Sequence, residues 1–246
     1  MRIHTAFALA LLLTTGAQAA DTESSATRIP DSAITQVTGL RERALKDDVA
    51  YAITEGLTSE IGARLAGSDN DLKARDWMIA RFKALGFDKV WSEEVSYPRW
   101  IRRSESAAVI EPFAQPLAVA ALGNSAGTPK GGLETEVVRF ESLAAMQAAP
   151  DYLVNRKIVY IANPGMQALK DGHDYGMAAQ VRVSGPASAA AKGAIGFLMR
   201  SAGSDQNRIA HTGVTHFEDQ AKAIPAAALS SPDADLLDHI FARGKP

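Results

Sequence analysis

The chain of 246 residues is long enough for one large domain or two small ones, and its 46% apolar and 22% charged residues are ordinary for a folded soluble protein. Its net charge of -2 gives no reason to expect nucleic acid or an anionic membrane as a partner. The sequence contains no cysteine, which excludes disulfides, thiolate metal sites, a cysteine nucleophile and lipid attachment through a lipobox cysteine.

The N-terminal residues show the order of features that is typical of a signal peptide. Arg2 is followed by an apolar run at 6–13, too short to span a bilayer, and then by a small-residue cleavage site at 17–20. A buried N-terminal helix is the alternative. We predict a signal peptide over 1–20 and an exported product, periplasmic or secreted, that crosses no membrane after cleavage. The polar stretch 21–33 is predicted to be a disordered leader.

The first region after the leader, 34–97, is predicted to hold two helices and one strand. Apolar residues recur on one face over 34–53, which indicates a single helix. A second helix is predicted over 69–85, with an apolar stripe of Ala74, Trp77, Met78, Phe82 and Leu85. Ser68 is expected to cap this helix and Gly86 to end it. The loosely alternating residues 89–97 are predicted to be an edge strand.

The second region, 104–243, has the pattern of a small, complete α/β domain. Four strands are predicted around its core, at 107–110, 117–120, 133–140 and 224–229, together with a helix at 141–149. A last helix is expected to be capped by Ser231, with Pro232 at its first position and a buried stripe of Leu236, Leu237, Ile240 and Phe241.

The core of the second region is predicted to be a strand, a small helix and a parallel strand. Apolar runs at 158–162 and 194–199 suit strands that are buried on both faces. Pro186 suits the first position of the small helix between them, and Gly193 suits the residue just past its end. The connection 163–185 is longer than most in a compact domain, so we expect it to be functional or partly disordered.

The two regions differ in how much apolar surface each can bury. Two amphipathic helices and one edge strand cannot cover their own apolar faces, because the first region has no sheet to pack against. The predicted fold class is therefore α/β, with the incomplete start of one α/β domain followed by a small α/β domain.

Short segments in order from 34 to 243 resemble the two-zinc exopeptidases related to carboxypeptidase Q. These segments are 62–68, 98–103, 105–107, 111–112, 122–125, 127–129, 193–194, 200–201, 211–213 and 224–225. In that family a protease-associated domain is inserted just after the first edge strand of the peptidase domain. The resemblance implies that 34–97 opens the zinc-exopeptidase domain and that 104–243 is the inserted domain.

The resemblance also implies a chemistry for the intact protein. Paired zinc ions, held by His and carboxylate ligands, would polarise the scissile carbonyl of a peptide substrate and generate a hydroxide. The family's ligand motifs begin with His-x-Asp and follow the insert, whereas this sequence contains no His-x-Asp. The resemblance therefore implies that this chain binds no catalytic zinc and is inactive alone. Dimerisation occurs among relatives, so a homodimer stays open.

Acidic and histidine residues are the residue types from which this chain could build a substitute zinc site. Glu93 and Glu94 are adjacent but lie in the predicted edge strand, where a solvated edge is the simpler interpretation. His211 and His216 are five residues apart, on neither one helix face nor one strand face, so we interpret them and His173-Asp174 as exposed loop residues. His239 follows Asp235 by four residues, which favours a surface pair.

The remaining candidates have structural interpretations. The serines Ser68, Ser184 and Ser201 do not lie in the sequence context of a nucleophile elbow. Ser68 and Ser184 suit local caps or turns. The tryptophans are expected to pack, Trp77 in the core and Trp91 and Trp100 at the junction of the two regions. Gly62 and Gly67 form no phosphate loop, because no strand precedes them and no Lys-Ser/Thr follows. The sequence thus yields no catalytic, cofactor-binding or metal-binding residue.

Two functions remain open at this point. The chain is either the front portion of an exported zinc aminopeptidase or dipeptidase, or a stand-alone protease-associated domain that binds peptides or a protein partner without catalysis. Exposed apolar stripes in 34–97 favour the first hypothesis, because a stand-alone module would leave them in water.

Overall fold

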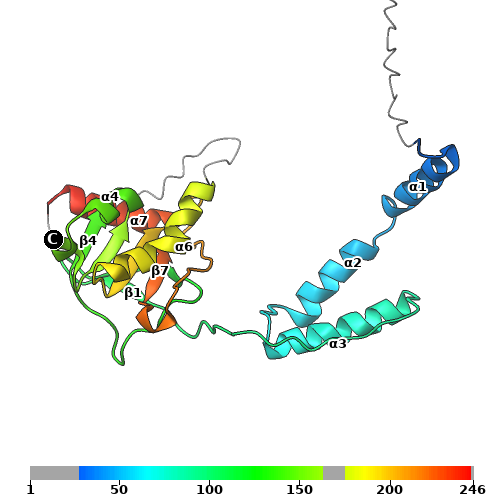
Figure 1. Ribbon diagram of the computed structural model, residues 1–246, viewed down its shortest axis with the longest axis horizontal. Helices are drawn as coiled ribbons and strands as arrows, with labels where there is room; N and C mark the ends of the chain where they lie inside the picture. The colour runs from blue at the N-terminus through cyan, green and yellow to red at the C-terminus, as the bar shows by residue number, and fades with distance from the viewer. Residues whose placement is uncertain (1–27, 163–174, 245–246) are drawn as a thin grey trace, which may run out of the picture. The chain divides into compact units, whose positions relative to one another are not determined.

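The computed structural model describes residues 28–162 and 175–244, so the predicted signal peptide and most of the predicted leader lie outside the described residues. The chain divides into two compact units, with the division between Glu94 and Val95. Helices make up the first unit, and the strands of the described residues all belong to the second (Figure 1). Within the described ranges, no helix is both long enough and apolar enough to cross a bilayer.

The first unit begins with two helices where the sequence predicts one. α1 spans Asp31–Ala44 and α2 spans Val49–Gly56, continued by the π-helical turn η1 at Leu57–Ile61. The prediction of a continuous helix is wrong because the Asp47 carboxylate accepts a hydrogen bond from Val49 N at 3.2 Å, which starts a new helix there. The predicted leader is also too long, since its last residues belong to α1.

The helix α3, Asp69–Ala84, confirms the predicted capping. Ser68 accepts a hydrogen bond from Asp71 N, and Gly86 follows the helix with a positive φ of 85°. Trp77 of α3 is half-buried rather than in a full core; it lies against Gly56 and donates to Glu60 Oε2 at 2.8 Å. No residue of α3 is fully buried, so its apolar stripe is only partly covered.

The predicted edge strand at 89–97 is wrong. No strand lies between α3 and the strand β1, Ala107–Val109, although every residue of that stretch is described. An edge strand needs a neighbour that accepts its backbone hydrogen bonds. The described part of the first unit contains no strand to supply one.

A five-stranded sheet in the order β3-β7-β6-β5-β4 forms the centre of the second unit. Its strands are β3 (Val119–Ala121), β4 (Val137–Phe140), β5 (Ile158–Ile161), β6 (Gly196–Arg200) and β7 (Ala226–Leu229). Strands β4 to β7 pair in parallel, whereas β3 is antiparallel to β7. The predicted parallel pair of the core is confirmed as β5 and β6, with Ile158 opposite Gly196.

The predicted strand at 117–120 is two strands in different sheets. β2, Gln115–Leu117, pairs with β1, and β3 then joins the large sheet. The change occurs at Ala118, whose carbonyl accepts from Ser230 N at 2.9 Å while its N–H donates to the Asp233 carboxylate. β4 and β7 are shorter than predicted at their N-terminal ends.

The helix α6, Tyr175–Ala191, is longer than the predicted small helix and contains Pro186 in its interior. The prediction that Pro186 starts the helix is wrong; Gly185 and Pro186 are buried in its middle, and Gly185 lies against Phe197 of β6. The predicted end is confirmed, because Gly193 has φ 85° and its N–H donates to Ala190 O. Part of the predicted connection 163–185 is thus helical, and its remainder lies outside the described residues.

Helices cover both faces of the large sheet. α6 and α4, Leu143–Ala148, pack on the face with Phe197 and Met199, and the short α5, Asp151–Val154, adds Val154 there. α7, Ser231–Ala242, packs on the face with Tyr160, and its predicted stripe is confirmed around the buried Leu237. Its N-cap is Ser230 rather than the predicted Ser231, so Pro232 occupies the second helical position. The alternation of strand side chains produces these two layers.

We expect Gly185→Ala to lower the free energy of unfolding by about 1–3 kcal/mol, the usual result of forcing extra volume into a packed core. An added Cβ would lie 2.6 Å from Cζ of Phe197, which is 1% exposed. Gly176→Ala in the same helix meets nothing within 4 Å and serves as the matched control. Urea unfolding followed by circular dichroism makes the comparison, and equal stability of the two variants would contradict this account.

The burial of the Tyr160 phenol leads us to expect a loss of folding stability at alkaline pH. Its side chain is fully buried, and this burial raises the pKa of the phenol well above its ordinary value. Above about pH 10 the unfolded chain releases this proton while the folded chain keeps it, so stability falls as pH rises. Tyr160→Phe should lessen the fall by up to about 1.4 kcal/mol per pH unit. Urea titrations at several pH values test this, with exposed Tyr152→Phe as control.

Candidate functional site

The loop after β6 meets the start of α6 in the second unit, and the side chains gathered there form the candidate site. In parallel α/β sheets, ligands bind beyond the carboxyl ends of the strands, which is where this loop begins. Tyr175 Oη lies 2.8 Å from His211 Nε2, and the Tyr175 and His211 rings meet edge-on at 5.8 Å. Arg182, two turns along α6 from Tyr175, donates from a guanidinium N–H to the phenol oxygen at 3.1 Å.

Two hydrogen bonds link the members of this cluster, whereas the buried Arg182 Nε has no hydrogen-bond partner among the described residues. Arg182 donates to the phenol oxygen, and the Tyr175–His211 hydrogen bond takes its direction from the tautomer of the imidazole. The Arg182 guanidinium also lies against Gly213, where an added Cβ would come within 2.6 Å of it. The cluster thus joins the loop after β6 to the start of α6, which is a structural task.

The resemblance raises the question of whether these residues fit zinc. Within 28–162 and 175–244, no three side chains of the metal-ligating types His, Asp or Glu come together in a group that would hold a metal ion. The described part of the chain therefore does not fit the zinc pair of the resemblance, and no catalytic step through a metal is assigned to it.

The acid pair and the other histidines lie apart from the cluster. Glu93 and Glu94 are exposed, and Glu93 accepts a hydrogen bond from Trp91 Nε1 at 2.9 Å. His216 and His239 are also exposed, whereas His173-Asp174 lies outside the described residues. Asp235, predicted to pair with His239, instead accepts from Arg200 at 2.5 Å, because the strand places that guanidinium beside α7.

The serines take the local roles that the sequence favours, and one has a further role. Ser68 caps α3, and Ser184 donates to Gln180 O of the preceding helical turn at 2.8 Å. Ser201 is buried; it donates to Leu229 O and accepts from His211 N at 2.8 Å. These bonds fix the loop after β6 to β7, and a buried, bonded hydroxyl is poorly placed for attack on a substrate.

The tryptophans predicted at the junction differ from each other. Trp91 is 69% exposed, whereas Trp100 is half-buried and donates from its indole N–H to Ser125 O at 3.0 Å. The Arg102 guanidinium lies 5.2 Å from the centre of the Trp100 ring. Both contacts of Trp100 are made inside the second unit.

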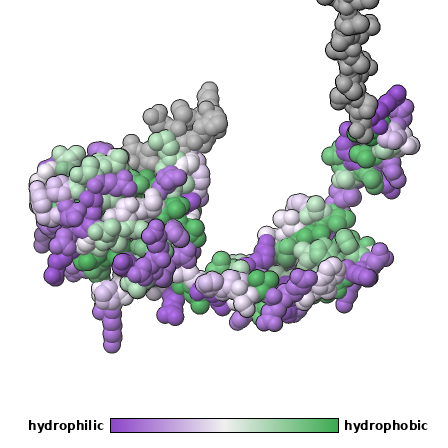
Figure 2. Space-filling view, in the orientation of Figure 1, coloured by the Kyte–Doolittle hydropathy of each residue, from purple (hydrophilic) through white to green (hydrophobic). Residues whose placement is uncertain are grey.

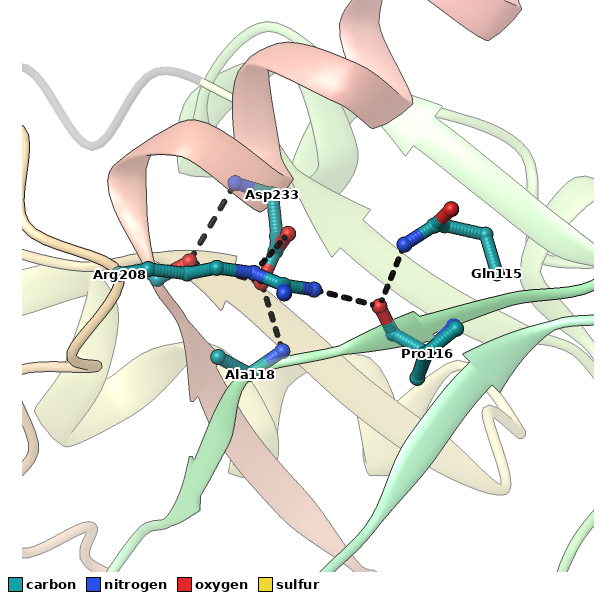
Figure 3. Close-up of polar contacts among 6 residues, drawn as sticks. Gln115, Pro116, Ala118, Arg208 and Asp233 are labelled. Carbon is teal, nitrogen blue, oxygen red and sulfur yellow. Dashed lines mark hydrogen bonds and ion pairs between the residues drawn. The ribbon is translucent and has the colours of Figure 1, made fainter.

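The sequence did not reveal the contacts of the buried Asp233 carboxylate, which accepts hydrogen bonds from three residues of the second unit (Figure 3). Its oxygens accept from Ala118 N at 2.6 Å, from Ser230 Oγ at 2.9 Å and from Arg208 Nε at 3.0 Å. Arg208 also donates to Pro116 O at 2.7 Å. The spacing of Ser230 and Asp233 marks a helix start, but nothing in it indicates the distant partners.

A second polar contact of α7 involves Arg139 of β4. Its guanidinium donates to Asp238 at 2.7 Å and to Glu141 at 2.6 Å. The bond to Glu141 is the main cause that raises the pKa of Arg139, with Asp238 adding to it. These contacts hold α7 over the edge strand β4, which is a structural role.

The comparisons with known proteins agree on one family. Carboxypeptidase Q from Mus musculus is 32% identical over 188 residues, which cover 76% of this chain and 38% of that protein. The Bos taurus protein is 33% identical over 189 residues with the same coverage. A peptidase M28 precursor from Shewanella amazonensis SB2B is 43% identical, with a TM-score of 0.81 over 88% of this chain and 49% of that chain. No family model matches the chain.

A zinc aminopeptidase from Bacillus subtilis shares the fold alone, at 18% identity and a TM-score of 0.50 over 78% of this chain and 41% of that chain. The α/β fold and these matches define the class of protein as M28 peptidase. Within that class the chain belongs to the carboxypeptidase Q-like family. It spans about two fifths of the length of the curated relatives and about half of the Shewanella chain.

We expect Asp233→Ala to lower the free energy of unfolding by about 1–3 kcal/mol, because the Ala118 amide and Arg208 lose their acceptor. Asp233→Asn keeps an oxygen for the Ala118 amide and should cost less. Exposed Glu218→Ala is the control in the same unit. Urea unfolding of the three variants gives the order, and an alanine variant as stable as wild type would refute the role of Asp233.

Proposed function

We propose that this chain forms the front portion of an exported zinc-dependent exopeptidase, an aminopeptidase or dipeptidase. The observation that carries the proposal is the match to the Shewanella peptidase M28 precursor, at 43% identity and a TM-score of 0.81 over 88% of this chain. The shares of the relatives covered, 38% and 49%, support the view that the catalytic residues come from sequence beyond these 246 residues. Zinc would polarise the scissile carbonyl and supply a hydroxide.

The two units have different roles in this proposal. The first unit opens the peptidase domain, and the second is the protease-associated domain, which would cover the active-site cleft and help to select peptide substrates. The second unit suits an inserted domain because its central sheet carries helices on both faces and has its own core. An insert of this kind folds as a unit by itself.

The surface of the first unit supports the front-portion hypothesis over a stand-alone binding module. No residue of α1 or α3 is buried, and apolar surface gathers over the helices of this unit (Figure 2). Large apolar side chains that are at least half exposed in this unit are Ile29, Ile34, Val37, Leu40, Leu45, Tyr51, Leu65, Leu72, Phe87 and Trp91. We propose that the rest of the peptidase domain covers them, as partly covered apolar faces require a partner.

The proposed zinc dependence yields a paired prediction. The purified 246-residue chain, loaded with zinc, should hydrolyse an aminoacyl amide no faster than a metal-free control. The whole coding product, obtained by reading the DNA past the codon for Pro246, should contain a His-x-Asp segment and hydrolyse dipeptides. A chelator should abolish that activity and added zinc should restore it.

Either of two results would defeat the proposal. One is zinc-dependent hydrolysis by the 246-residue chain alone, and the other is a whole product that stays inactive with zinc present. Export is checked separately by the intact mass of the secreted or periplasmic protein. We expect the mass of a chain whose first residue is Ala20 or Asp21. A product that keeps residues 1–20 would contradict export by this signal.

A further inference from the structure

β3 has an outer edge in the second unit. At Ala121 of this edge, no strand of the described residues pairs with the backbone N–H and C=O groups. β3 is the last strand on one side of the large sheet. On the β7 side, Ala118 O accepts a hydrogen bond from Ser230 N, and Leu122 N donates to Ala226 O. Because strand residues alternate in direction, the N–H and C=O of Ala121 point to the opposite, outer edge.

Side chains from the segment before β1 occupy that edge. The Ala121 N–H donates to the Glu105 carboxylate at 2.6 Å, and the Arg102 guanidinium donates to Ala121 O at 2.7 Å. Arg102 and Glu105 also form an ion pair at 3.3 Å. Thr212 Oγ1 donates to the same carbonyl at 2.8 Å. One charged pair thus meets both backbone groups that a neighbouring strand would have paired.

Trp100 fixes this segment at a second point. Its indole N–H donates to the carbonyl of Ser125, a residue that is 7% exposed, and its ring lies beside the Arg102 guanidinium. The indole therefore holds the main chain near β3 and restricts the arginine that contacts Ala121.

The next outward-facing residue of the edge, Gly123, is covered by backbone instead. Gly123 N donates to Gly213 O at 2.7 Å, and Thr215 N donates to Gly123 O at 2.8 Å. This strap is tight, because an added Cβ on Gly123 would lie 2.9 Å from the Val214 side chain. The β3 edge is thus covered by a backbone strap at Gly123 and by side chains at Ala121.

We propose that Trp100, Arg102 and Glu105 form a side-chain latch on β3, which fixes the place where the chain joins the second unit and blocks the Ala121 edge to another strand. Exposed sheet edges are sites where another strand can add, and charged side chains on the edge prevent this. A paired strand is held by a series of backbone hydrogen bonds, whereas this latch depends on three side chains at the surface of the unit. It is therefore the part of the edge that opens most easily.

Trypsin cleavage of the full chain tests the latch. The peptide bond after Arg102 should be protected in the wild type, whereas the bond after exposed Lys130, in a turn, serves as an internal reference. Glu105→Gln removes the charge that meets the Ala121 amide and Arg102, and should speed cleavage after Arg102 about tenfold at low protease. Trp100→Phe keeps a ring but loses the bond to Ser125, and should speed it about threefold.

Exposed Glu134→Gln in the same unit is the matched control and should leave both cleavage rates unchanged. Hydrogen exchange at the Ala121 amide gives a second readout, and Glu105→Gln should speed it about tenfold. The latch is refuted if the wild-type chain is cut after Arg102 as fast as after Lys130. It is also refuted if Glu105→Gln changes neither the cleavage after Arg102 nor the exchange at Ala121. None of these measurements depends on zinc or on catalysis.

Discussion

The carboxylate of Asp233 joins parts of the second unit that lie up to 115 residues apart in sequence (Figure 3). It accepts from the residue between the two sheets, Ala118, from the cap of α7, Ser230, and from the loop after β6 through Arg208. A buried charge is stable only with several donors, so each of these three segments must be in place for the others to hold. The change from one sheet to another at Ala118 and the position of α7 are therefore parts of one arrangement.

A steric constraint on the opposite face fixes the position of α6. Gly185 allows α6 to lie directly on the Phe197 ring, and the ends of α6 are set by Gly193 and by the Tyr175 contacts with the loop after β6. Pro186 in the helix interior costs one backbone hydrogen bond, but it is buried against the sheet, where packing offsets the loss. Tertiary packing thus outweighs the local preference of proline for a helix start.

These two cases show which features could be predicted from the sequence. The parallel pair β5 and β6, the cap Ser68 and the helix ends at Gly86 and Gly193 depend on neighbouring residues, and their patterns were sufficient. The interior position of Pro186 and the Asp233 contacts depend on residues that meet only after folding. The break of the first helix is local, because Asp47 bonds to Val49 N, but the apolar periodicity of the stretch does not reveal it. That this chain contains no catalytic residue stays a prediction. Only the resemblance indicates that the family's metal ligands lie elsewhere in the protein.

The two units differ in how completely they bury their apolar side chains. The second unit buries its apolar residues on both faces of a sheet and satisfies even the outer edge of β3 with its own side chains. The first unit instead buries Gly56 under Trp77 and leaves most of its large apolar side chains in contact with solvent. Apolar burial is the main favourable term in folding, so helices with this surface gain stability only when further chain covers them. The exposed apolar surface is thus on the first unit, the one that our proposal makes the start of the peptidase domain.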